Sequence, residues 1–329
     1  MALGDVTDIS GIPYLDSSQL VGRFIPSVMF YDEDWRMWLQ TEKGQFIETQ
    51  GWPAEALYLG RRPEQPTDFC SSFLTFMGQR ANFTRLMPLF AAVQDDFFNL
   101  SAALAKLDLI SSSDHNGRGG AHRMAATEVE YILQLCRSLF DLLQEVVAKL
   151  WLEITMVAPS PKKKALKKAF SEMTLHGDAL RSAEQIANQF ALPAVIADCY
   201  ARHSPLFLKI REFRNSLVHG GSRVQTIFSG DDGFQIAKRL GPFRNLNIWY
   251  DDEVAPNDLV PLKPALGLLI HGTIGALEDF ADTLSACIQF PNPTAPGMSL
   301  YMRGYFNKAL VEALEDAAQR RSEGKCLIG

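Results

Sequence analysis

The chain has 329 residues, of which 47% are hydrophobic and 21% charged, a balance typical of a globular protein with one large or two modest domains and not of a disordered one. Its formal net charge of −6 excludes a strongly basic protein that coats nucleic acid, but it allows an enzyme that meets RNA through one local patch. Five widely spaced cysteines, without metal-finger or redox spacing, indicate a reducing cytoplasm. We expect no membrane segment, because the longest apolar stretch, at 264–277, is too short to span a bilayer and the N-terminus lacks a basic-then-apolar leader.

Residues 1–110 are expected to form a mixed and partly helical N-terminal region. Aromatic residues are dense within 24–58, with turn residues between them, and this pattern allows short strands such as one at 45–49. From about Asp68 apolar residues recur at steps of three and four, which predicts helix. The polar, glycine-rich segment within 111–123 is the best candidate for a linker.

Residues 124–290 are expected to form a helical bundle. Apolar stripes predict one long helix at 127–153 and another at 263–288. One further helix is expected to begin at Pro193. A separate helix is expected from Pro205 to His219, with Ser204 as its N-cap and two glycines after its end. Three cysteines fall on these apolar stripes and are expected to be buried thiols: Cys136, Cys199 and Cys287.

Two further segments complete the predicted fold. Residues 222–260 are expected to form a small hairpin or meander inserted into the bundle, with a β-like run at 246–250. Residues 291–329 are expected to contain a C-terminal helix, at 301–321. The expected fold class is therefore mainly α, an antiparallel helical bundle with a small β-hairpin insertion and a mixed N-terminal region.

The segment 211–221 carries most of the chemical information in the chain. Arg214 stays protonated and offers a planar fork of donors to a phosphate. His219 titrates near neutrality and can take or give a proton, and Asn215 can orient that base or bind a phosphate oxygen. RNA supplies its own nucleophile, the 2′-hydroxyl, so these groups would suffice for transesterification without a metal.

Helical geometry complicates this interpretation. Five helical steps separate Arg214 from His219 by about 140° around the axis, whereas Asn215 and His219 share a face. Either the helix relaxes at His219, or Arg214 reaches around it, or a second protomer completes the site.

No other motif in the chain points to a known chemistry. The sequence contains no phosphate-binding glycine loop, no Gly-x-Ser-x-Gly, no His-Glu-x-x-His and no Cys-x-x-Cys. Asp114, His115 and His122 are better interpreted as part of a polar linker than as metal ligands. We therefore expect neither a metal nor a cofactor.

The run Arg214-Asn215-Ser-Leu-Val-His219 resembles the signature of the HEPN superfamily, an arginine and a polar residue followed at short distance by a histidine. The resemblance covers roughly 125–290 and implies a HEPN-like bundle that forms a homodimer, with a metal-independent endoribonuclease site between two copies of the motif. By position, His219 would be the general acid or base, Arg214 would stabilise the transition state and Asn215 would support them. The resemblance also implies a role as a toxin or antiviral-defence effector, and an inhibitory or antitoxin partner.

Two alternatives remain open. The chain could be a non-catalytic module that binds a nucleotide, RNA or a protein, or a structural helical protein in which Arg214 pairs with Glu212 or Asp198. Lys209 and Arg211 could add contacts to RNA, although such residues more often only solvate a helix. The lysine run at 162–168 has the same two interpretations.

Overall fold

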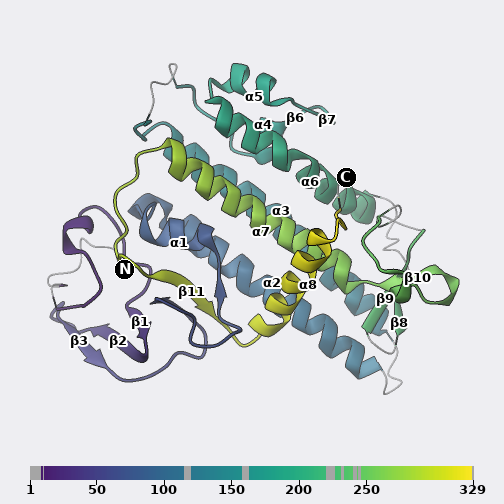
Figure 1. Ribbon diagram of the computed structural model, residues 1–329, viewed down its shortest axis with the longest axis horizontal. Coiled ribbons are helices and arrows are strands. Elements are labelled where there is room, and N and C mark those ends of the chain that lie inside the picture. Colours follow the sequence, from purple (N-terminus) through teal and green to yellow (C-terminus); the bar gives the residue numbers. More distant parts are fainter. Residues whose placement is uncertain are drawn as a thin grey trace.

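Four long helices form the helical part of the protein and run alongside one another (Figure 1). The computed structural model describes residues 9, 11–114, 120–157, 163–219, 227–230, 233–239, 243 and 246–327, without the side chains of 114 and 214–219. Its α-helices are α1 (Ser72–Gln79), α2 (Met87–Asp114), α3 (Ala121–Trp151), α4 (Phe170–Thr174), α5 (Ala183–Phe190), α6 (Ala194–His219), α7 (Lys263–Cys287) and α8 (Asn307–Ser322). The long ones are α2, α3, α6 and α7, and α3 packs against the other three.

Aromatic side chains from four helices meet in the centre of this helical part. Phe170 of α4 lies 4.8 Å from Phe140 of α3 and 5.0 Å from Phe207 of α6, between ring centroids. Phe280 of α7 lies 6.2 Å from Phe170 and 4.8 Å from Tyr200 of α6. All five side chains are completely buried. Burial of this size is the main force that holds α6 against α3 and α7.

A mixed β-sheet lies at one end of the helices (Figure 1). The described strands are β1 (Met29–Asp32), β2 (Asp34–Gln40), β3 (Phe46–Thr49), β4 (Ala56–Gly60), β5 (Phe69–Cys70), β6 (Leu175–His176), β7 (Ala179–Leu180), β8 (Ile227–Gly230), β9 (Gly233–Ala237), β10 (Leu259–Pro261) and β11 (Ser299–Arg303). Among them, six form one sheet in the order β3-β2-β1-β4-β11-β5, in which β1 and β4 are parallel and the other pairs antiparallel.

The expected fold class, a mainly α HEPN-like bundle, is wrong. Of the described residues, 53% are helical and 17% are in strands, and the mixed sheet and two smaller sheets that they form make this an α/β fold. One error lies at 301–303, where the predicted C-terminal helix overlaps β11 (Ser299–Arg303). This segment pairs with β4 on one side and β5 on the other, so backbone hydrogen bonds to residues more than 200 positions away determine its conformation.

An ionic cluster within the sheet joins β11 to the chain before β5. Asp68 accepts hydrogen bonds from Arg303 Nε at 3.0 Å and Nη2 at 2.8 Å, and from the Tyr58 hydroxyl at 2.7 Å. Arg303 also pairs with Glu64, and its guanidinium lies 4.7 Å from the centre of the Trp35 ring. Asp68 and Arg303 are both buried, so each charge relies on the other.

The predicted hairpin within 222–260 is confirmed. The described strands β8, β9 and β10 form an antiparallel sheet in the order β10-β9-β8.

The β-like run predicted at 246–250 is not a strand. Its Ile248 and Trp249 are buried, and the Trp249 indole donates to the Pro261 carbonyl at 2.8 Å, so packing explains their apolar character.

The long predicted helices and the helix start predicted at Pro193 are close to the observed ones, but the predicted start of a new helix at Ser204-Pro205 is wrong. The helix begins at Ala194, eleven positions before Pro205, and the proline lies inside it. Ser204 is not an N-cap, because its hydroxyl donates to the Tyr200 carbonyl of the preceding turn at 2.6 Å. At the predicted linker within 111–123, α2 continues to Asp114 and α3 begins at Ala121. The division of the chain into domains stays a prediction.

Candidate functional site

Helix α6 carries the whole predicted motif on its last turns. Its last described side chain, Phe213, is buried and lies 5.0 Å from the ring of Phe243, so the core holds the helix up to the residue before Arg214. The backbone stays helical through His219. The side chains of Arg214, Asn215 and His219 lie outside the described residues, and their roles stay predictions.

Two predictions about the end of α6 fall outside the described residues. They are the helix end at Gly220 and Gly221, and the ion pairs of the Arg214 side chain. Among the described residues, Glu212 lies 3.8 Å from the ammonium of Lys209. The Lys209 ammonium also lies 5.2 Å from the centre of the Phe213 ring, which holds this lysine along its own helix.

Arg211, the other predicted contact residue, lines a basic cavity. The cavity has a volume of about 550 Å³, and four cationic side chains line it: Arg137, Lys167, Arg181 and Arg211. They come from α3, the segment before α4, the segment before α5, and α6. One carboxylate, that of Glu172, is also in the lining, and Arg211 pairs with the exposed Asp178 at 3.3 Å. Arg137 also pairs with Asp141 at 3.1 Å, so the cavity and its paired carboxylates carry only a small excess of positive charge, in a protein whose net charge is negative.

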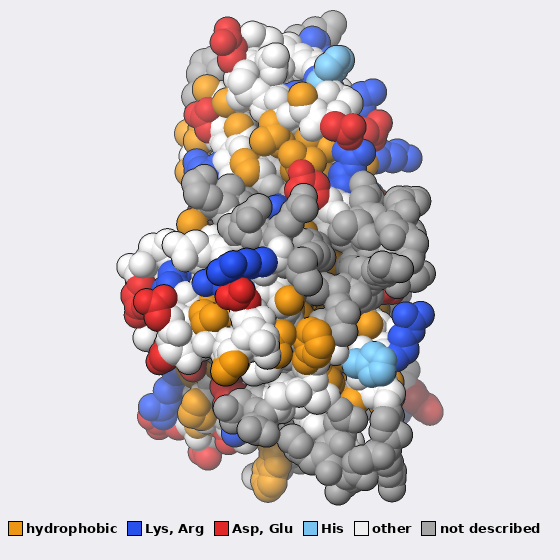
Figure 2. Space-filling view, turned by 90° about the vertical axis from the view of Figure 1, so that its right-hand side faces the viewer, with side chains coloured by type: hydrophobic (Ala, Val, Ile, Leu, Met, Phe, Trp, Pro, Cys, Tyr) orange, Lys and Arg blue, Asp and Glu red, His pale blue; other side chains and the backbone are white. Residues whose placement is uncertain are grey.

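The surface of the molecule near the C-terminal end of α6 carries side chains of several chemical types. It faces the viewer in Figure 2, together with the β8–β10 sheet. Hydrophobic, basic and acidic side chains are all visible there, beside residues that the structure does not describe. The described residues at this end offer a nucleic acid local basic groups and not a continuous basic surface.

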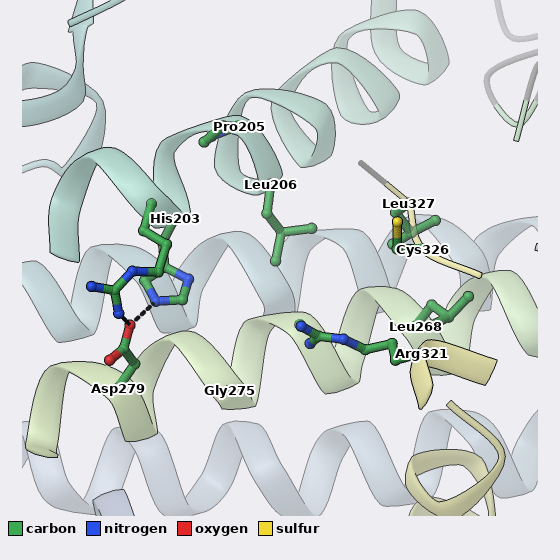
Figure 3. A pocket seen from close by; sticks show the side chains of 11 residues that line it. His203, Pro205, Leu206, Leu268, Gly275, Asp279, Arg321, Cys326 and Leu327 are labelled. Carbon is green, nitrogen blue, oxygen red and sulfur yellow. Dashed lines mark hydrogen bonds and ion pairs between the residues drawn. The ribbon is translucent and has the colours of Figure 1, made fainter. Parts of the chain in front are cut away.

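A second group of chemically active side chains lies between α6 and α7. Cys199 and His203 are four residues apart on α6, and Asp279 faces them from α7. Asp279 Oδ2 lies 2.7 Å from His203 Nε2 (Figure 3). The same oxygen lies 3.7 Å from Cys199 Sγ. Arg202 binds the same carboxylate oxygen. We call Cys199, His203 and Asp279 the Cys-His-Asp cluster.

The cluster lies beside a cavity of about 510 Å³ that extends toward Arg321 and the end of the described chain (Figure 3). Gly272 of α7 makes the close approach of the two helices possible, because a Cβ atom there would lie 2.7 Å from Leu206 of α6. His203 and Asp279 line the cavity, and Cys199 is completely buried behind them.

Burial determines the direction of the pKa shifts of Cys199 and His203, but not that of Asp279. It raises the pKa of the Cys199 thiol to about 12, so the thiol stays protonated at neutral pH. Burial also lowers the pKa of His203 below its ordinary value, against the opposing effect of Asp279. Burial acts to raise the pKa of Asp279, but the hydrogen bond with His203 and the charge of Arg202 outweigh it, and the pKa lies below its ordinary value. A neutral thiol next to a carboxylate is a poor nucleophile, so the cluster is not an activated cysteine site.

The sequence interpretation did not identify this cluster. It predicted Cys199 as a buried thiol, which is confirmed, together with Cys136, whereas Cys287 is only half-buried. The spacing of Cys199 and His203, four residues apart on one helix, was a usable signal. Asp279 is 76 residues from His203, and no local pattern could have connected them.

Comparisons with protein-family models, curated proteins and solved structures give no match. Among the described residues, no helix combines the length and apolar character needed to cross a bilayer. The chemistry of the chain must therefore be argued from its own residues.

Proposed function

We propose that the chain is a metal-independent endoribonuclease of the HEPN type that acts as a homodimer. The observation that supports this most is the place of the motif. Arg214, Asn215 and His219 occupy the last turns of a helix whose preceding turns are anchored in the core by Tyr200 and Phe207. A firmly held helix end is a suitable support for groups that must meet a phosphate with little freedom.

The proposed reaction needs only groups on this chain and on RNA. His219 takes the proton of a 2′-hydroxyl, and the resulting oxygen attacks the neighbouring phosphorus. The bond from phosphorus to the 5′-oxygen breaks, and that oxygen takes up a proton. Arg214 stabilises the charge that develops on the non-bridging phosphate oxygens. The products are a 2′,3′-cyclic phosphate and a 5′-hydroxyl.

The basic cavity supports RNA as the substrate. Arg211 precedes Arg214 by three residues and Asn215 by four, so these positions lie on one side of α6 and within about 6 Å along its axis. A strand with one phosphate at the motif could place a neighbouring phosphate at Arg211 and extend into the basic cavity. The salt dependence of binding reports how many such contacts are made.

The test is cleavage without metal. Purified full-length protein is incubated with end-labelled single-stranded RNA and transfer RNA in excess EDTA, and the product ends are analysed. We expect cleavage to persist and to leave 2′,3′-cyclic phosphates. Products with 3′-hydroxyl ends, or activity that requires an added divalent metal, would refute the proposal. Binding of RNA without any cleavage would instead identify the chain as a non-catalytic module.

A second prediction concerns the basic cavity. The double variant Arg181→Ala and Arg211→Ala should bind single-stranded RNA more weakly. The slope of log K against log salt should fall by about 0.7 for each phosphate contact removed. Arg62→Ala is the matched control, since it removes an exposed arginine from the sheet end of the molecule. Equal slopes for the double variant and the unmodified protein would exclude the cavity from RNA binding.

A further inference from the structure

The Cys-His-Asp cluster has the composition of a metal site. It offers one thiol, one imidazole and one carboxylate, and the three ligand atoms all lie within 4.8 Å of one another. Zinc accepts this set of sulfur, nitrogen and oxygen ligands, whereas calcium and magnesium require oxygen alone. Cys199 and His203 lie one helical turn apart on the same face of α6, so a single rigid element fixes two of the three ligands.

The two distances to Asp279 Oδ2 are close to those of a tetrahedral zinc ion, and Cys199 Sγ lies within 4.8 Å of a ring nitrogen of His203, so these two ligands must move closer together as an ion binds. With bond lengths of 2.0–2.3 Å, two ligands of such an ion lie about 3.3–3.8 Å apart. The Cys199 Sγ to Asp279 Oδ2 distance of 3.7 Å already falls in this range. The His203 Nε2 to Asp279 Oδ2 distance is 2.7 Å, a hydrogen bond, and it must lengthen by about half an ångström when an ion replaces the shared proton.

We propose that Cys199, His203 and Asp279 bind a zinc ion that connects α6 to α7. As the ion binds, the Cys199 thiol releases its proton to solvent and donates as a thiolate, and His203 donates the lone pair of Nε2 with its ring proton on Nδ1. Among the described residues these three supply the protein ligands, and a water molecule from the adjoining cavity takes the fourth position.

Arg202 competes with the ion for Asp279. Its guanidinium binds Oδ2, the oxygen that would face the ion. The Arg202 side chain is 56% exposed, so it can turn into solvent when the ion takes its place. Removal of this arginine should therefore strengthen zinc binding, an effect opposite to that of removing a ligand.

The zinc site is separate from the proposed nuclease site. His203 precedes His219 by sixteen residues, which corresponds to about 24 Å along α6. The ion would stabilise the pair α6 and α7, because it binds the folded arrangement and not the unfolded chain.

The experiment is a titration of the reduced full-length protein with Co²⁺, followed by displacement with Zn²⁺. We expect one Co²⁺ per chain, with a thiolate-to-metal charge-transfer band and visible bands of a tetrahedral ion, both removed by one equivalent of Zn²⁺. Zn²⁺ should also raise the melting temperature by several degrees. Absence of these bands and of any thermal shift in the unmodified protein would overturn the proposal.

Variants identify the ligands. Cys199→Ser should abolish the charge-transfer band, and Asp279→Asn should lower the affinity for Zn²⁺ at least about tenfold. Cys287→Ser is the matched control on α7, eight residues after Asp279, and should change neither. Arg202→Gln should raise the affinity. An unchanged band in Cys199→Ser, or weaker binding in Arg202→Gln, would exclude this site even if another ligand variant failed to fold.

The outcome is independent of the proposed nuclease. Below the melting temperature of the zinc-free protein, EDTA should lower stability but leave RNA cleavage intact. A protein that binds zinc without cleaving RNA would support this site and refute the nuclease proposal, and a protein that cleaves without binding zinc would do the reverse.

Discussion

Replacement of His219 with alanine is expected to slow RNA cleavage by about 10²–10⁴-fold, because the 2′-hydroxyl loses the group that accepts its proton. Replacement of Arg214 with alanine is expected to cost about 10²–10³-fold, since the charge on the phosphate oxygens loses its fixed cation. Single-turnover cleavage of a labelled RNA measures both effects. Arg214→Lys should recover part of the loss, because lysine restores the charge but not the planar fork.

The controls remove the same side-chain types elsewhere. His122 is exposed in the first turn of α3, and Arg62 is exposed after β4. His122→Ala and Arg62→Ala should cleave at the unmodified rate. Full activity in His219→Ala would contradict the proposed mechanism, whatever Arg214→Ala shows.

Mixing the two inactive variants tests whether the site is shared between protomers. If one subunit supplies Arg214 and its partner supplies His219, a heterodimer of Arg214→Ala and His219→Ala contains one intact site. Random exchange then restores about one quarter of the unmodified activity. If both groups come from the same subunit, the mixture stays inactive, and the 140° separation must be overcome within one helix.

The second large effect concerns stability. Asp68→Ala is expected to lower the free energy of unfolding by about 3–5 kcal/mol, because it leaves the buried Arg303 guanidinium with only part of its pairing. The Tyr58 hydroxyl and the backbone N–H of Gln65 each lose a hydrogen-bond acceptor at the same time. The midpoint of denaturant unfolding, at constant slope, measures the change.

A surface ion pair gives the matched control. Arg36 and Glu48 pair across β2 and β3, and both side chains are more than one third exposed. Glu48→Ala should leave the midpoint almost unchanged, since solvent screens such pairs. A loss in Asp68→Ala no larger than that in Glu48→Ala would show that the buried cluster does not hold the sheet together.

The same cluster predicts a response to acid. Burial acts to raise the pKa of Asp68, but hydrogen bonds from Arg303 and Tyr58 outweigh it, and the pKa lies below its ordinary value. The ionised carboxylate therefore contributes stability above its unfolded pKa of about 4, and this contribution is lost as the pH falls through the lowered value. Asp68→Asn should remove this part of the acid sensitivity.

The helices were predictable where their signal is local. The expected helices at 127–153 and 263–288 differ from α3 and α7 by a few residues, because apolar residues at three- and four-residue spacing report directly on a buried helical face. The helix predicted to begin at Pro193 was wrongly divided at Ser204-Pro205, which has the composition of a helix start, whereas α6, with Ile196 and Tyr200 buried before the proline, continues through it.

Long-range contacts account for the rest. The segment 299–303 shows no strand signal strong enough to outweigh the neighbouring helix, and β11 exists because β4 and β5 bind it from both sides. The Cys-His-Asp cluster likewise depends on Asp279, which only the packing of α7 against α6 brings to His203. The side chains of the Arg214–His219 motif, the strongest functional signal in the sequence, are not described, so their proposed chemistry depends on the experiments above.

The position of β11 between β4 and β5 has a consequence for biosynthesis. During translation the two neighbouring strands leave the ribosome more than 200 residues before the strand that must lie between them. The nascent chain therefore carries unpaired strand edges while the residues between β5 and β11 are synthesised, a state that chaperones bind and that favours aggregation. A premature stop before Ser299 would leave the six-stranded sheet without β11, so a translation product that ends there should be insoluble or rapidly degraded.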